Sequence, residues 1–155
     1  MNEARIVFTG GGTGGHVFPL LAVSEEASRL LWLSKATFSL YYIGPVSGPF
    51  DIPVGLFEQK GIAVCAIRSH SVRGEGTYKI SGWFEIFRGV FQTLWHLWVI
   101  MPDVIFSKGG YGAIPVLLVA MVYRIPVLIH ESDSIPGKVN EFFGKYAARI
   151  AVSFE

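Results

Sequence analysis

The stretch RIVFTGGGTGGHVFPLLAV, residues 5–23, decides the fold, because an apolar run leads through five closely spaced glycines into a stretch marked by a proline. Each glycine loses more conformational entropy on folding than any other residue, so such a loop indicates that something approaches the backbone closely. Pro19 is tolerated in the first turn of a helix, where its missing N–H would have no partner, which predicts a helix beginning between Gly15 and Phe18. The N-terminal N–H groups and the positive end of the helix dipole then favour an anion at the loop.

Short apolar runs alternate with longer helical patterns along the rest of the chain. This alternation predicts parallel strands with crossover helices, and runs that are apolar throughout are typical of strands covered on both faces. We therefore expect one α/β domain over residues 1–155, a Rossmann-like, doubly wound parallel sheet. The expected strands are 5–10, 38–44, 62–67, 103–107, 126–131 and 149–153, and the expected helices are 16–34, 80–101, 113–123 and 138–147.

Polar turns like the first one follow two later strands, in SKGGYGAIP at 107–115 and HESDSIPGKVN at 130–140. If the strand order is 3-2-1-4-5, the two glycine turns flank the topological switch point, where ligands bind outside the carboxyl ends of the strands. The first loop satisfies G-x-G-x-x-G, but no acidic residue ends the second strand, which disfavours a dinucleotide site. No Gly-Lys-Ser/Thr follows the glycines, which disfavours a P-loop. A purely structural turn stays open as the alternative.

Composition limits the classes of partner. The chain of 155 residues is 51% hydrophobic and carries a formal net charge of +1, which suits one domain with a core and gives no electrostatic reason to expect nucleic acid. Its single cysteine, Cys65, lies in an apolar run and indicates a buried thiol in a reducing compartment. The start lacks the apolar core of a secretory signal, and prolines and an arginine break the most apolar window, 113–130, so we expect no transmembrane helix. No metal-ligand spacing or cofactor motif is evident.

Four motifs in order, GGTGGHVFPLLAV, SVRGEG, PDVIFSKGGYGAIP and IPVLIHESDSIPGKVN, resemble the N-terminal domain of the MurG family of glycosyltransferases. The resemblance spans almost the whole chain and implies half of a GT-B enzyme without a metal. It implies inverting transfer of N-acetylglucosamine from UDP-N-acetylglucosamine (UDP-GlcNAc) to the 4-hydroxyl of N-acetylmuramic acid (MurNAc) in an undecaprenyl-pyrophosphate-linked acceptor, in peptidoglycan synthesis. The implied location is peripheral, on the cytoplasmic face of the bacterial plasma membrane.

In that family the first domain binds the lipid-linked acceptor and the second holds the UDP-sugar. The resemblance therefore implies that UDP-GlcNAc is bound by a C-terminal domain absent from this sequence or by a partner chain. One alternative is a non-catalytic anchoring subunit of a split transferase, like the eukaryotic Alg14 chain with its Alg13 partner. A dinucleotide-dependent oxidoreductase is a second alternative, and the missing acidic residue argues against it.

The resemblance supplies the candidate site residues. Two residues are rival candidates for the general base that takes the proton of the acceptor hydroxyl, His16 and Asp133. His16 stands at the helix start, where the helix dipole lowers its pKa. The alternative that His16 merely caps the loop stays open. Ser132 and Asp133 depart from the glutamine and asparagine usual in the family, and a carboxylate there repels a diphosphate unless it is protonated or paired, for example with Lys138. The other predicted substrate-binding residues are Gly12, Thr13, Gly14, Gly15, Arg73, Gly110, Tyr111, His130, Glu131 and Asn140.

The expected helix at 80–101 is unusually rich in aromatic residues. Its polar residues recur every three or four positions and leave one narrow polar stripe, so its apolar surface is wider than a helix on a sheet needs. The tryptophans and phenylalanines favour a membrane-docking surface, with burial against a neighbour or a further domain as the alternative. The polar stripe consists of Ser81, Glu85, Arg88, Gln92 and His96, and the aromatic residues are Trp83, Phe84, Phe87, Phe91, Trp95 and Trp98.

Overall fold

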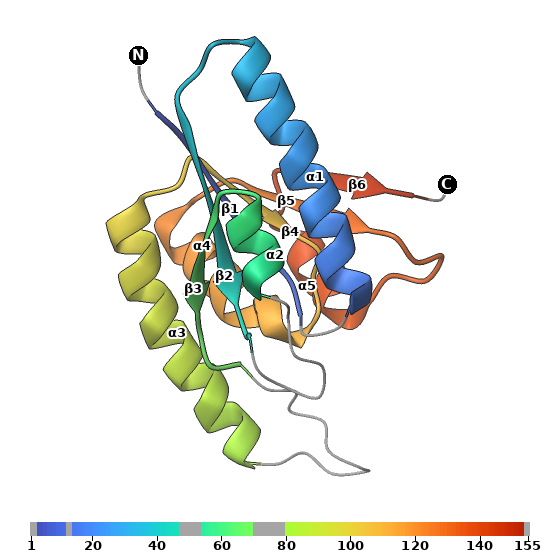
Figure 1. Cartoon of the computed structure of the whole chain (residues 1–155). Helices are drawn as coiled ribbons and strands as arrows, with labels where there is room; N and C mark the ends of the chain where they lie inside the picture. Colours follow the sequence, from blue (N-terminus) through green and yellow to red (C-terminus); the bar gives the residue numbers. More distant parts are fainter. Residues whose placement is uncertain (1–2, 12–13, 47–53, 70–79, 154–155) are drawn as a thin grey trace.

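The computed structural model describes residues 3–11, 14–46, 54–69 and 80–153, which form a sheet with helices on both faces (Figure 1). All neighbouring strands are parallel, and the order is β3-β2-β1-β4-β5-β6. The predicted doubly wound order is confirmed, with a sixth strand added beside the fifth. The strands are β1 (Ala4–Thr9), β2 (Phe38–Gly44), β3 (Ile62–Ala66), β4 (Val104–Ser107), β5 (Val127–Glu131) and β6 (Arg149–Val152).

The helices follow the predicted pattern except for the short helix α2 and for the place of Pro19 in α1. The described helical segments are α1 (Gly14–Leu33), α2 (Val54–Gln59), α3 (Ile80–Ile100), the 3₁₀ turn η1 (Tyr111–Ala113), α4 (Ile114–Tyr123) and α5 (Lys138–Gly144). The short helix α2 was not predicted, because six residues with one buried side chain, Phe57, carry too little periodicity. Phe57 packs on Tyr42 with ring centroids 4.6 Å apart.

The predicted place of Pro19 in the first helical turn is wrong. Helix α1 begins at Gly14, so Pro19 lies in its second turn. Proline has no N–H to donate, so the carbonyl of Gly15, four residues earlier, does not receive the usual helical bond from residue 19. The helix starts one residue before the predicted range of Gly15 to Phe18, so the last two glycines of the loop form its first residues and its N-terminal end still faces the loop.

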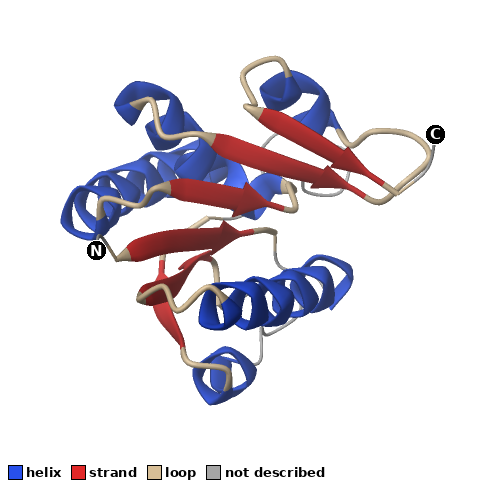
Figure 2. Cartoon of the chain, turned by 90° about the horizontal axis from the view of Figure 1, so that it is seen from above, coloured by secondary structure: helices blue, strands red, loops and turns tan. Residues whose placement is uncertain are grey.

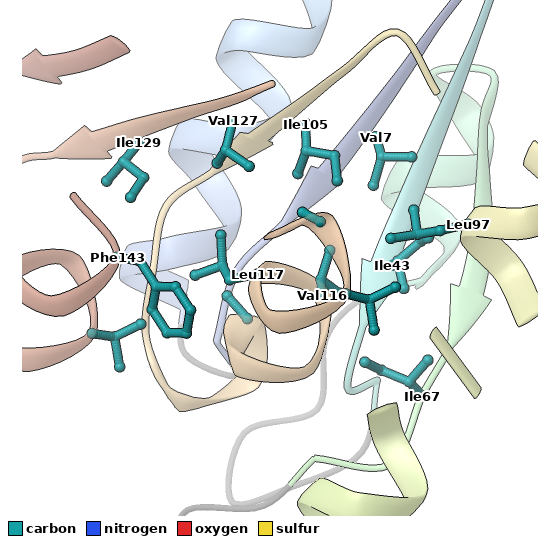
Figure 3. Packing of buried hydrophobic residues seen from close by; sticks show 14 of the residues in the cluster. Val7, Ile43, Ile67, Leu97, Ile105, Val116, Leu117, Val127, Ile129 and Phe143 are labelled. Atoms are coloured by element: carbon teal, nitrogen blue, oxygen red, sulfur yellow. The ribbon is translucent and has the colours of Figure 1, made fainter. Parts of the chain in front are cut away.

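Helices lie on both faces of the sheet, as Figure 2 shows from above, and an apolar core fills the space on each face. Successive residues of one strand point to opposite faces, so Ile105 and Phe106 of β4 belong to different cores. On one face the strand side chains meet α3, α4 and α5 through Leu97, Leu117 and Phe143 (Figure 3). Helices α1 and α2 cover the other face. Burial on both faces explains why the central strands are largely apolar, whereas the four residues of β6 are exposed.

The parallel register brings the ends of the central strands to one edge of the sheet. Thr9 of β1 is level with Ser107 of β4, and Ser107 is level with Ile129 of β5. The turns that follow β1, β4 and β5 therefore start side by side. The chain leads from β1 to β2 on one side of the neighbouring pair β1 and β4, and from β4 to β5 on the other side. Because the strand order reverses between β1 and β4, the carboxyl ends of these two strands form the topological switch point.

Candidate functional site

The two glycine turns at the switch point pack backbone against backbone. The Gly11 N–H donates to the Gly109 carbonyl at 2.9 Å, and the Lys108 N–H donates to the Thr9 carbonyl at 3.0 Å. A Cβ on Gly112 would lie 2.8 Å from the Gly11 Cα, closer than real Cβ atoms approach another atom. Part of the glycine content is therefore explained by contact between the turns, as the structural alternative predicted, and not by a ligand.

His16 lies in the first turn of α1 and faces the second glycine turn. A Cβ placed on Gly110 would be 3.3 Å from the His16 Nε2 atom, and one placed on Gly10 would lie 3.6 Å from the His16 Cβ and 3.4 Å from the Lys108 Cβ. The imidazole Nδ1 is buried and has no hydrogen-bond partner among the described residues. His16 is therefore held between the two turns beside Lys108.

Burial lowers the pKa of His16, and the Lys108 ammonium lowers it further, while the carboxylates of Asp133 and Glu131 oppose the shift only in part. The direction is the predicted one, and its main causes are burial and then the charge of Lys108. At pH 7 the imidazole is neutral and able to accept a proton, as a general base must.

Lys108 is the site residue that the sequence analysis missed. It directly follows β4 and is only 3% exposed, and its charge lowers the pKa of both His16 and His130. Buried lysines are rare without a charged partner or a functional role. The available signal was a lysine between an apolar strand and two glycines, in SKGG, at the carboxyl edge where ligands bind.

Glu131 and Asn140 form a brace that holds the turn between β5 and α5. The Glu131 carboxylate accepts hydrogen bonds from the Asn140 Nδ2 at 2.9 Å, the Gly137 N–H at 3.0 Å and the Asp133 N–H at 3.1 Å. Burial acts to raise the pKa of Glu131, but these bonds and the Lys108 ammonium together hold it below its ordinary value. The carboxylate is therefore ionised at neutral pH, with both oxygens engaged inside the domain.

The brace reaches the second glycine turn through Asn140. Its amide lies against Gly109, where any Cβ would collide with it, and Gly109 adopts a left-handed φ of 82° that also favours glycine. The Asn140 Oδ1 is buried and has no donor among the described residues. Glu131 and Asn140 thus join the β4 and β5 turns. The sequence predicted instead that both residues contact the substrate.

The remaining candidates lie around this centre. His130 is half-buried, stacks on Phe106 and has its Nε2 3.3 Å from the Ser153 Oγ. Asp133 is exposed and forms no ion pair with Lys138 within the part of the chain that the structure describes.

Tyr111 is half-buried and packs partly against the α3–α4 core, so it has a packing role beside the substrate contact that stays a prediction. Gly110 faces Gly11 and His16, and Gly14 and Gly15 open α1. Gly12, Thr13 and Arg73 lie outside the described residues.

Replacing Lys108 with methionine is expected to raise the pKa of His16 and of His130, because a nearby positive charge disfavours the imidazolium form. Both titrations, followed by NMR of the ring protons, should move to higher pH and approach the ordinary value of 6.5. Lys145→Met, at an exposed position after α5, removes the same charge and serves as the control. Unchanged histidine titrations in Lys108→Met would show that the ammonium does not act on the site.

Six parallel strands with helices on both faces of the sheet, and apposed glycine turns at the switch point, define a Rossmann-like α/β domain of the GT-B glycosyltransferase type. The chain belongs to glycosyltransferase family 28, since the profile of that family's N-terminal domain matches residues 48–152. The resemblance to this class predicted from the four motifs is confirmed.

Relatives and solved structures agree with the family. The chain is 38% identical over 151 residues to the Clostridium botulinum protein named UDP-N-acetylglucosamine--N-acetylmuramyl-(pentapeptide) pyrophosphoryl-undecaprenol N-acetylglucosamine transferase, covering 97% of this chain and 40% of the relative. A Bacillus cereus protein of the same name, numbered 2, is also 38% identical, over 152 residues, covering 97% of this chain and 41% of its own length. The chain thus spans about 40% of the length of these curated relatives.

The crystal structure of Acinetobacter baumannii MurG superimposes with a TM-score of 0.77 at 28% identity, covering 98% of this chain and 42% of that one. The calicheamicin glycosyltransferase CalG4 superimposes with a TM-score of 0.59 at 16% identity, covering 94% of this chain and 36% of that one, and shows a shared fold alone.

Proposed function

We propose that this chain is the acceptor-binding half of an inverting N-acetylglucosaminyltransferase. The acceptor is undecaprenyl-pyrophosphoryl-MurNAc-pentapeptide, and the donor is UDP-GlcNAc, held by a further domain or a partner chain. The relatives' names support the substrates. The observation that carries the proposal is the pair of apposed glycine turns beside a neutral His16 and a buried Lys108, at the edge where doubly wound sheets bind ligands.

Each part of this site has a distinct role in the proposal. The N-terminal N–H groups of α1 and the Lys108 ammonium supply positive potential for the acceptor diphosphate. Neutral His16 takes the proton of the MurNAc 4-hydroxyl as that oxygen attacks C1 of the donor sugar and UDP leaves. The Glu131–Asn140 brace keeps the turns in register, and exposed Asp133 stays the rival base. No metal or cofactor enters the proposal.

The two alternatives have weaker support. The relatives are named as transferases, which favours a part in the transfer reaction over a purely anchoring role. A dinucleotide-dependent oxidoreductase is disfavoured by the glycosyltransferase family match and by β2, which ends in Tyr-Ile-Gly without an acidic residue.

The proposed test titrates the chain with a water-soluble, short-prenyl diphosphate-linked MurNAc-pentapeptide, with inorganic pyrophosphate as a second probe. We expect saturable binding of both, perturbation of the His16 resonances, and no turnover when UDP-GlcNAc is added, because the described residues account for an acceptor site only. Binding without any effect on His16 would contradict the assigned site. Full turnover by this chain alone would contradict the division of labour between the two halves.

The same proposal places the protein at the cytoplasmic face of the bacterial plasma membrane, through an aromatic face of α3. We define the aromatic face as the side chains that point away from the sheet: Phe84, Phe87, Phe91, Trp95 and Trp98, each 64–68% exposed. Among the described residues of the polar stripe, Arg88 is exposed, whereas Glu85, Gln92 and His96 are half-buried and less exposed than the aromatic face. No helix in the described part of the chain is long and apolar enough to cross a bilayer.

A lipid surface is the occupant we assign to this face, because the named acceptor of the relatives carries an undecaprenol chain that stays in a bilayer. Ring-bearing side chains are favoured at the lipid interface, where their apolar bodies leave water. Exposed Met121 and Val122 of the neighbouring helix α4 add to the apolar surface, and the Tyr123 hydroxyl ties α4 to α3 by donating to the Leu94 carbonyl at 3.3 Å.

The double variant Phe87→Glu/Phe91→Glu is expected to bind phospholipid vesicles at least about tenfold more weakly. Each ring taken out of water contributes about 1.5–3 kcal/mol, and the two rings are neighbours with centroids 6.4 Å apart. Co-sedimentation with vesicles containing anionic lipid measures the effect. The matched control is Leu30→Glu/Trp32→Glu, two exposed apolar positions on α1 at the opposite face of the sheet. Equal losses in both variants would show that the aromatic face is not the docking surface.

A further inference from the structure

Three residues that follow β3 connect helix α3 to the second glycine turn. The Ile67 N–H donates to the Gly44 carbonyl at 3.0 Å and so continues the sheet ladder. The next N–H, of Arg68, donates to the Gln92 side-chain oxygen at 2.8 Å. The Ser69 hydroxyl then donates to the Tyr111 carbonyl at 3.1 Å. Segment 67–69 is therefore bonded in turn to β2, to α3 and to η1.

Helix α3 lies directly against this segment. A Cβ on Gly89 would collide with the Arg68 carbonyl oxygen and would lie 3.0 Å from Pro115 in the first turn of α4. Gly89 and Gln92 are three residues apart, so they share one side of the helix and contact the same short segment. The absence of a side chain at Gly89 lets the helix backbone approach closely enough for the Gln92 bond.

Ser69 is a polar residue in a place where apolar ones are usual. It is 5% exposed, and its hydroxyl reaches a carbonyl that already accepts the Ile114 N–H at the start of α4. A buried hydroxyl is costly unless it is bonded, so its contribution depends on this contact with the Tyr111 carbonyl. Tyr111 lies between Gly110 and Gly112, the two residues that pack on Gly11 of the first turn.

We propose that Ser69 is a positioning residue for acceptor binding, which holds the Tyr111 turn against segment 67–69 and thereby against α3. This inference rests on the proposed function and adds a residue to it. Ser69 touches no ligand in this role and acts by fixing the position of Tyr111, whose half-buried ring packs partly against the core and is the part of the turn proposed to contact the acceptor sugar. Two hydrogen bonds then fix the Tyr111 turn, proposed to bind the acceptor, to helix α3, proposed to rest on lipid. They are the bond from the Ser69 hydroxyl to the Tyr111 carbonyl and the bond from the Arg68 N–H to the Gln92 side chain.

The test is a double-mutant cycle on the chain, read as the dissociation constant for the short-prenyl diphosphate-linked MurNAc-pentapeptide. Ser69→Ala is expected to weaken binding about threefold to tenfold, the value of one lost net hydrogen bond. Tyr111→Ala keeps the main-chain carbonyl that Ser69 bonds but removes the ring. In that background Ser69→Ala should alter the dissociation constant less than about 1.5-fold, because Ser69 acts by positioning the ring. Ser28→Ala removes a comparable serine-to-carbonyl bond in α1, 2.8 Å long, and should leave binding unchanged.

The outcomes separate the two claims. If the unaltered chain does not bind the acceptor, the proposed function fails and the role of Ser69 fails with it. If the chain binds and Ser69→Ala binds equally well, or weakens binding by the same factor with and without Tyr111, only the role of Ser69 is overturned. Should Ser69→Ala fold poorly by circular dichroism, Gln92→Leu at a half-exposed position replaces it in the cycle and is judged by the same criteria.

Discussion

With the proposed donor-binding domain or partner chain present, His16→Ala is expected to lower kcat by about 10²–10⁴-fold, the usual contribution of a positioned general base. The expectation follows from the surroundings of His16: burial and Lys108 keep the imidazole neutral, and the side chain lies against Gly110 in the second glycine turn. The apparent KM for UDP-GlcNAc should stay the same, because the donor is bound elsewhere. Initial rates against both substrates provide the measurement.

The pH profile makes the His16 prediction sharper. Only neutral His16 accepts the proton, and its pKa is lowered, so the acid limb of kcat should have its midpoint below the ordinary histidine value of 6.5. Lys108→Met should move that midpoint to higher pH, in parallel with the NMR titration. His96→Ala is the matched control, because burial also lowers the pKa of His96 but it lies on α3.

A loss of acceptor affinity with an intact kcat in His16→Ala would make His16 a binding contact and not the base. Asp133→Asn decides between the rival bases in the same assay. If that variant loses the rate and His16→Ala keeps it, the exposed carboxylate is the base.

Gly112→Ala should both destabilise the domain and weaken diphosphate binding. The new Cβ would lie 2.8 Å from the Gly11 Cα and 2.8 Å from the Pro45 Cγ, so one turn must move away from the other. Overpacking of this kind costs about 1–3 kcal/mol, which for a domain of this size lowers Tm by about 2–12 °C. Affinity for inorganic pyrophosphate should fall about tenfold or more, because the N–H groups of the two turns lose their register.

The control for Gly112 is Gly55→Ala in α2, where no atom lies within 4 Å of the new Cβ. That substitution should be neutral or stabilise by about 0.4–1 kcal/mol, because alanine restricts the unfolded chain. Thermal unfolding followed by circular dichroism compares the two variants. A Gly112→Ala variant that is as stable as Gly55→Ala and binds pyrophosphate normally would show that the contact between the turns is not needed.

Much of the architecture was predictable because its signals are local. Apolar runs such as VIFS before a glycine turn predict a strand end, and the central strand order follows from the rules for doubly wound sheets. The failures have local causes too. Helix α2 is too short to show a period, and Pro19 is accommodated in the second turn of α1, one turn later than proline preference suggests.

The site was only partly predictable. Sequence patterns selected His16, Glu131 and Asn140, but they assigned the last two to a ligand, whereas the carboxylate and the amide bond to each other. A pattern identifies a polar residue at a strand end without showing which neighbour satisfies it. Helix α3 illustrates the same limit, since periodicity found its polar stripe but left open whether its aromatic residues are exposed or buried, and the structure exposes five of them.

By itself, the sequence determined the α/β class, the order of strands and turns, and the family, because these depend on residues close together in the chain. The tertiary structure alone decided that Lys108 lies beside His16, that Glu131 bonds Asn140, and that Ser69 holds the Tyr111 turn. These partners come from different strands and helices and meet only where parallel strands end at one edge. Charge, burial and hydrogen bonding in the site are therefore properties of the packed fold.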